Sequence, residues 1–154
     1  MPGLLRRTTT AGLLVVFLLA EPATPPYWKS SSARFPFAYM QLDCSPDDGI
    51  ALNFYFTARK SECGKYSEPF VEISIWRSLP KSVPYSIDVR GWDGIAIRCL
   101  KPGACETATS ATLHLDKFIQ GVSSSGEYEL HFKDGSVEKD KFDATACHVY
   151  SLCG

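Results

Sequence analysis

Net charge is nearly absent from this chain. Its 154 residues include 16 Lys and Arg against 17 Asp and Glu, mixed along the sequence, for a formal net charge of −1. A nucleic-acid-binding protein usually carries a basic patch or stripe, and a protein that binds anionic membranes carries a basic cluster. We therefore expect no nucleic-acid partner, and no electrostatic attachment to a membrane.

Short catalytic motifs are also missing. The sequence contains no G-x-S-x-G, H-E-x-x-H, G-x-x-x-x-G-K-[ST] or C-x-x-C pattern. Its three histidines and its carboxylates show no catalytic spacing. The sequence thus predicts no cofactor and favours a non-catalytic protein, although separate loops can assemble an enzyme site without any local motif.

Long apolar runs are limited to residues 11–20, which follow Arg6 and Arg7. A basic segment followed by a short apolar run is typical of a secretory signal peptide, and this run is shorter than the roughly 20 residues that span a membrane. We expect residues 1–20 to be a signal peptide, residues 21–34 a flexible Pro- and Ser-rich lead-in, and residues 35–154 one β domain. The mature protein is then exported, periplasmic or extracellular, without stable membrane insertion.

The cysteines agree with export. There are six, all after the apolar run: Cys44, Cys63, Cys99, Cys105, Cys147 and Cys153. An even number in an exported chain predicts disulfides. Cys99 and Cys105 enclose a Pro-Gly turn and are expected to pair, while the pairing of the other four stays open. A zinc site at Cys147, His148 and Cys153 is the alternative, but it lacks the paired C-x2-C spacing of structural zinc sites.

Apolar residues alternate with polar ones after residue 35. Leu52, Phe54 and Phe56 share one face, as do Ile95 and Ile97, and the pattern recurs at residues 71–75, 85–89, 113–115 and 128–132. Such alternation predicts half-buried antiparallel strands, and no window of helical length carries an apolar stripe. We expect an all-β fold, a small antiparallel β-sandwich held by disulfides, with a closed β-barrel as the alternative.

Asp134-Gly135 is a strong hairpin signal between two apolar segments. A two-residue turn there pairs Phe132 with Val137. The apolar positions further on, beginning with Phe142, have the opposite parity, so we expect a β-bulge within residues 138–141 to restore the alignment.

A resemblance covers about a quarter of the chain. Residues 125–136 (SGEYELHFKDGS), followed by F-D-A at 142–144 and by Cys147, resemble the closing segment of uncharacterised bacterial exported proteins with an S-G-x-[YF]-x-L-x-F-x-D-G hairpin. The resemblance implies an exported β-sandwich of unassigned role, often a lipoprotein. This sequence departs from it at Asp140, where the second motif has Gly, and in lacking a lipid-attachment Cys.

A metal site is one functional hypothesis. If the turn at residues 120–125 is symmetric, His114 lies opposite His131 and Asp116 lies opposite Glu129. Directly opposed Cβ atoms in an antiparallel pair are roughly 4.5–5.5 Å apart, and imidazole with carboxylate suits zinc or copper(II). The alternative is an ordinary polar outer face that carries two histidines.

Surface recognition is a second hypothesis. The alternation places Tyr55 and Trp76 on outer faces, and Trp92 lies in a loop flanked by glycines. Exposed Trp and Tyr commonly anchor protein or glycan contacts.

A third hypothesis is a barrel that holds a small apolar ligand, which requires an unfilled interior, whereas the inward Leu, Ile, Phe and Val favour a filled core. We expect a binding or structural module whose ligand or partner the sequence does not identify.

Overall fold

The structure is a computed structural model that describes residues 34–76, 79–149 and 153. The predicted signal peptide and residues 21–33 of the predicted lead-in lie outside these residues. The described chain forms nine strands and a short 3-10 turn, η1 (Gly91–Asp93). The strands are β1 (Phe37–Cys44), β2 (Ile50–Thr57), β3 (Phe70–Ile75), β4 (Tyr85–Val89), β5 (Gly94–Lys101), β6 (Ala104–Thr107), β7 (Ser110–Ile119), β8 (Ser123–His131) and β9 (Val137–Cys147).

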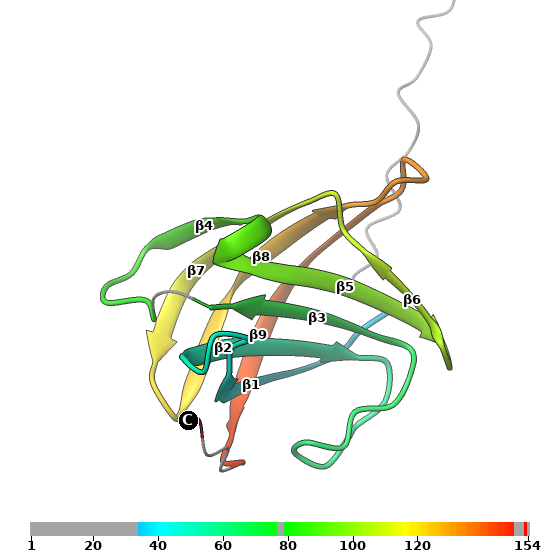
Figure 1. Cartoon of the computed structure of the whole chain (residues 1–154). Coiled ribbons are helices and arrows are strands. Elements are labelled where there is room, and N and C mark those ends of the chain that lie inside the picture. The colour runs from blue at the N-terminus through cyan, green and yellow to red at the C-terminus, as the bar shows by residue number, and fades with distance from the viewer. Residues whose placement is uncertain (1–33, 77–78, 150–152, 154) are drawn as a thin grey trace, which may run out of the picture.

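All nine strands belong to one sheet, in the order β4-β7-β8-β9-β1-β2-β3-β5-β6. Every pairing is antiparallel except that of β1 with β9, which is parallel and sets Met40 beside Ala146. The sheet curls into a half-barrel (Figure 1). The all-β prediction is confirmed, but the β-sandwich is wrong because the β1–β9 pair joins the two ends of the chain by hydrogen bonds into one sheet. A sandwich requires two separate sheets packed face to face.

Aromatic rings fill the middle of the half-barrel. Phe56 of β2 lies 4.4 Å from Tyr128 of β8 and 5.1 Å from Phe142 of β9, measured between ring centroids. Phe54 lies 5.6 Å from Phe142. These side chains are buried, so apolar burial between the two halves of the curled sheet is the main stabilising contribution. The predicted alternation of β2 is confirmed.

On β5 the predicted parity is wrong. Ala96 and Arg98 are buried, and they lie opposite the buried Ile73 and Val71 of β3, whereas Ile97 lies opposite the outward Glu72. Arg98 therefore occupies an inward position, although the alternation of Ile95 and Ile97 predicted that these two residues face inward.

Three disulfides tie the sheet together. The predicted Cys99–Cys105 bridge is confirmed, and the remaining bridges are Cys44–Cys153 and Cys63–Cys147. The zinc alternative is wrong, because both of its cysteines are bridged. Three disulfides are typical of oxidising, extracytoplasmic environments. Within the described ranges, no helix has the length and apolar character needed to cross a membrane.

Candidate functional site

A cavity of about 290 Å3 lies at the end of the half-barrel where β1, β7 and β9 finish and β2 begins. This end is in the lower part of the view in Figure 1. The wall is mainly apolar. It includes Met40, Leu42, Leu52, Phe118, Ala146 and Val149.

Small inward side chains explain why the interior is not filled here. Along β9 the inward residues shrink from Phe142 to Ala144 and then Ala146. On β8 the residues that lie opposite Phe142 and Ala144 are Gly126 and Ser124. The aromatic side chains therefore end at Phe142, before the end of the half-barrel is reached. The small residues beyond Phe142 leave a space between the facing strands.

Exposed apolar side chains lie at the end of the half-barrel that holds this cavity. Ile50 is part of the wall and is 57% exposed. Ile119 and Val122, which are 45% and 57% exposed, flank the wall residues Gln120 and Gly121 in the β7–β8 turn. Half of the large apolar side chains that are exposed in the described chain thus gather at this end. Such concentration is typical of surfaces that meet an apolar ligand or partner.

Two polar side chains at the mouth have no partner among the described residues. Gln120 and His148 line the cavity and are exposed. Asp43 also belongs to the wall, but its Oδ2 accepts a hydrogen bond from Gln41 Nε2 at 3.3 Å and its Oδ1 accepts one from the Cys44 amide at 2.8 Å. Among the described wall residues, the side-chain groups left to meet a ligand are therefore an amide and an imidazole.

Two disulfides hold one wall in place. Cys147 and Cys153, on either side of the wall residues His148 and Val149, are bridged to Cys63 and Cys44. One bridge joins this wall to β1 through Cys44, and the other joins it to the segment between β2 and β3 through Cys63. Both bridges restrict movement of the wall.

The residues of the metal hypothesis do not converge. His114 lies opposite Glu127, and His131 lies opposite Ser110. The two histidines are four ladder positions apart, roughly 13 Å at about 3.4 Å per residue. The β7–β8 turn is tighter than expected, with Ile119 opposite Ser123, and the register shifts again near Leu115. The expected opposition is therefore wrong.

Each histidine instead pairs with an acid on its own strand. His114 Nε2 lies 3.2 Å from Asp116 Oδ1, and His131 Nε2 lies 2.8 Å from Glu129 Oε1. The described part of the chain holds no group of three or more His, Cys, Asp or Glu side chains arranged to bind a metal ion.

Tyr55 faces outward as expected, but residues 58–69 cover it. Its ring stacks on Tyr66 with centroids 4.0 Å apart, and its hydroxyl donates to Glu72 Oε1 at 3.3 Å. Burial is the main cause that raises the pKa of both Tyr55 and Glu72. Tyr66 also donates to Gln41 at 3.3 Å. This polar cluster fastens the covering segment and leaves Tyr55 no free face.

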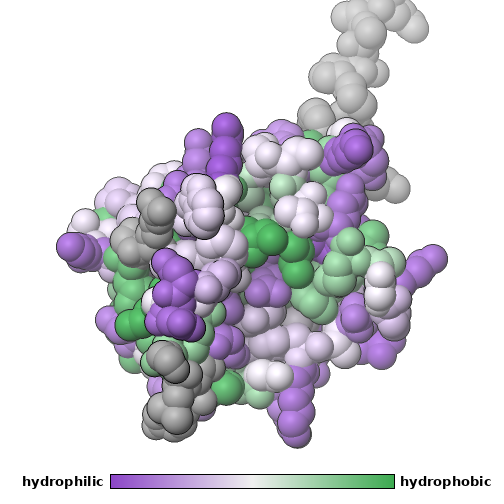
Figure 2. Space-filling model, in the orientation of Figure 1, coloured by the Kyte–Doolittle hydropathy of each residue, from purple (hydrophilic) through white to green (hydrophobic). Residues whose placement is uncertain are grey.

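The two tryptophans of the surface-recognition hypothesis differ. Trp76 is half-buried, and its backbone amide donates to the Asp93 carbonyl at 3.0 Å. Trp92 is 81% exposed on η1. Figure 2 shows that the apolar surface on the face it views is broken into separate patches among polar residues. Trp92 is thus accessible, but its immediate neighbours Gly91 and Asp93 offer no apolar surface.

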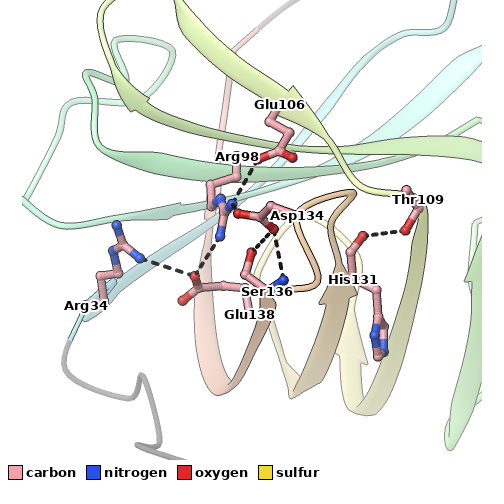
Figure 3. Close-up of polar contacts among 8 residues, drawn as sticks. All are labelled: Arg34, Arg98, Glu106, Thr109, His131, Asp134, Ser136 and Glu138. Carbon is pink, nitrogen blue, oxygen red and sulfur yellow. Dashed lines mark hydrogen bonds and ion pairs between the residues drawn. The ribbon is translucent and has the colours of Figure 1, made fainter.

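Charged groups gather at the opposite end of the half-barrel (Figure 3). Arg98 is buried, and its guanidinium lies 3.8 Å above the Phe132 ring. Glu106 and Glu138 approach it at 2.9 Å and 3.9 Å, and Arg34 lies 3.5 Å from Glu138. Asp134 also lies 3.7 Å from Arg98, so ion pairs link the residues that lie over this end of the interior.

No protein family, curated protein or solved structure matches this chain. The resemblance of residues 125–136 to exported bacterial proteins therefore stays a prediction.

Proposed function

We propose that this protein is a non-catalytic binding protein of an oxidising, extracytoplasmic compartment, and that the end cavity holds a small apolar ligand. The observation that carries the proposal is the apolar cavity of about 290 Å3 with exposed apolar residues at its mouth. Ligand sites in proteins are mostly apolar hollows of roughly 300–1,000 Å3 with a few polar groups. This cavity has that character, at the lower limit of size.

The other hypotheses have less support. An enzyme requires ionisable groups that converge on an accessible space, whereas Arg98 and Glu138 pair with each other and Glu72 is covered. Recognition through Trp92 rests on one exposed ring rather than on a patch.

The test is binding of a neutral fluorescent probe, N-phenyl-1-naphthylamine, to the oxidised full chain. The ten-carbon naphthyl group is the part expected to enter the cavity, with the phenyl ring left outside at the mouth. We expect saturable binding with a stoichiometry of one. Ala146→Leu adds apolar atoms to the cavity wall and is expected to weaken binding about tenfold, equivalent to about 1.4 kcal/mol. Its control is Ala104→Leu, which makes the same change on the exposed strand β6.

A thermal melt of each variant shows that it is folded. The proposal fails if the unaltered chain shows no saturable binding, or if a folded Ala146→Leu protein binds the probe as the unaltered chain does.

A further inference from the structure

The geometry points to a more specific ligand class: a small single-chain amphiphile whose head is uncharged and carries a hydroxyl or ester oxygen. This inference rests on the proposed function of the end cavity. Three features of the cavity favour this class: its size, the polar groups at its mouth and the charges around the mouth.

The size of the cavity excludes bulky lipids. Taking water's share of liquid volume, roughly 30 Å3 per non-hydrogen atom, as a guide, a volume of about 290 Å3 holds about ten such atoms. Sterols, haem and two-chain lipids are far larger. A single short chain fills the space between Met40 and Phe118 without moving the walls.

The groups at the mouth favour an oxygen-bearing head. The side-chain amide of Gln120 donates hydrogen bonds, and so does an N–H of the His148 ring. Neither side chain has a partner within the described residues, so a ligand oxygen meets donors that are otherwise hydrated. Each such hydrogen bond replaces a bond to water, so its net contribution to affinity is modest.

The charges around the mouth disfavour an anionic head. Among the described wall residues there is no Lys or Arg, and the carboxylate present, that of Asp43, already accepts two hydrogen bonds. Asp47 and Asp48 are exposed in the adjoining β1–β2 turn. Lys117 does not offset them, because it precedes the cavity-lining Phe118 and alternate strand residues point to opposite faces.

A positively charged head is also disfavoured at the mouth. Ile50 is part of the wall and is exposed at the mouth, and a charge beside apolar surface loses hydration. The carboxylates of Asp47 and Asp48 are exposed to water, so their attraction to a cation is too weak to replace that hydration. An uncharged head avoids both the repulsion from the nearby carboxylates and the loss of hydration of a charge.

The test compares three ligands with the same chain: octan-1-ol, octanoate and octylamine. Each competes with N-phenyl-1-naphthylamine for the oxidised full chain at about pH 7. We expect octan-1-ol to bind about tenfold more tightly than either ion, the equivalent of one or two hydrogen bonds. The double variant Gln120→Ala with His148→Ala is expected to lose most of this preference, and the ratio of the three ligand affinities within each protein is the readout.

Both substituted residues are exposed, and Lys117→Ala on the outer face is the matched control. If octanoate or octylamine binds as tightly as octan-1-ol, or if the double variant keeps the preference, the ligand class is overturned while binding of the probe still supports the cavity. If the probe itself does not bind, the proposed function and the ligand class fall together.

Discussion

At Gly126, strands β7 and β8 approach so closely that a side chain has no room. A Cβ there would overlap the backbone carbonyl of His114, next to the register shift after Leu115. Backbone atoms in a sheet cannot move aside as a flexible side chain can. We expect Gly126→Ala to lower the free energy of unfolding by about 1–3 kcal/mol, measured by urea denaturation. Ser125→Ala, one residue earlier in β8, is the control, and equal effects of the two would contradict this close approach.

Glu72 gives the molecule a pH-dependent contribution to stability. Burial raises its pKa above the ordinary value of 4.5, and hydrogen bonds from Ser74 and Tyr55 offset this only in part. Because the pKa is higher in the folded than in the unfolded protein, the contribution is fully present below the ordinary pKa and is lost as pH rises through the folded pKa. Glutamine can accept the same hydrogen bonds without a charge.

We therefore expect Glu72→Gln to be more stable than the unaltered protein at about pH 7, with the difference disappearing at acidic pH. Urea unfolding across a pH series measures this difference. Glu62→Gln, at an exposed position, is the control. A Glu72→Gln difference that stays constant down to about pH 3 would show that ionisation of this carboxyl is not its source.

Among the elements, the strands were predictable and their pairing was not. Alternation identified the inward face of β2, but a turn decides which faces of two strands meet. His131 pairs with Val137, so residues 132–136 form a longer turn than the Asp134-Gly135 signal suggested. With this register Phe142 lies opposite Gly126 on the same face, and the β-bulge predicted for residues 138–141 is wrong because the parity needs no correction.

The end cavity was not predictable for a related reason. Its space comes from the small residues Ala144 and Ala146 on β9. That these residues border a cavity can be inferred only once β1 is known to pair with β9. Alternation reports where apolar side chains point, not whether they meet across the interior. The short Cys99–Cys105 loop was predictable, because its turn is local in the sequence.

The charged cluster around Arg98 lies at one end of the interior and links residues from different strands through ion pairs. Replacing one partner of a buried ion pair leaves the other charge uncompensated and costs about 3–5 kcal/mol. We expect Arg98→Ala to lose about 3 kcal/mol, the lower end of this range, because Glu138 is buried but keeps its contact with the half-exposed Arg34. The double variant Arg98→Met with Glu138→Leu is expected to recover most of the loss, measured by urea denaturation.

Arg90→Ala is the control for this prediction. Arg90 lies 3.9 Å from Asp88 with both side chains largely exposed, and exposed pairs contribute about 0–1 kcal/mol. If Arg98→Ala costs no more than Arg90→Ala, the interior cluster does not depend on charge matching.

At the scale of the whole molecule, two of the disulfides join segments that are far apart in the sequence. Cys44–Cys153 spans 109 residues and Cys63–Cys147 spans 84, whereas Cys99–Cys105 spans 6. A bridge that closes a longer loop removes more conformational freedom from the unfolded chain. The two long bridges act beside the β1–β9 pair, which joins the two halves of the sheet and borders the cavity.

Removing the long and the short bridge should therefore have different consequences. Loop entropy predicts a loss of about 5 kcal/mol for Cys44→Ser with Cys153→Ser and about 2 kcal/mol for Cys99→Ser with Cys105→Ser. Only the first pair borders the cavity, so only its removal should also weaken binding of N-phenyl-1-naphthylamine, measured well below the melting temperature of each variant. If both double variants keep full affinity for the probe, the wall at His148 and Val149 does not need the Cys44–Cys153 bridge, and packing with the Cys63–Cys147 bridge is sufficient. If both lose affinity equally, the effect of the bridges is global stability rather than the shape of the cavity.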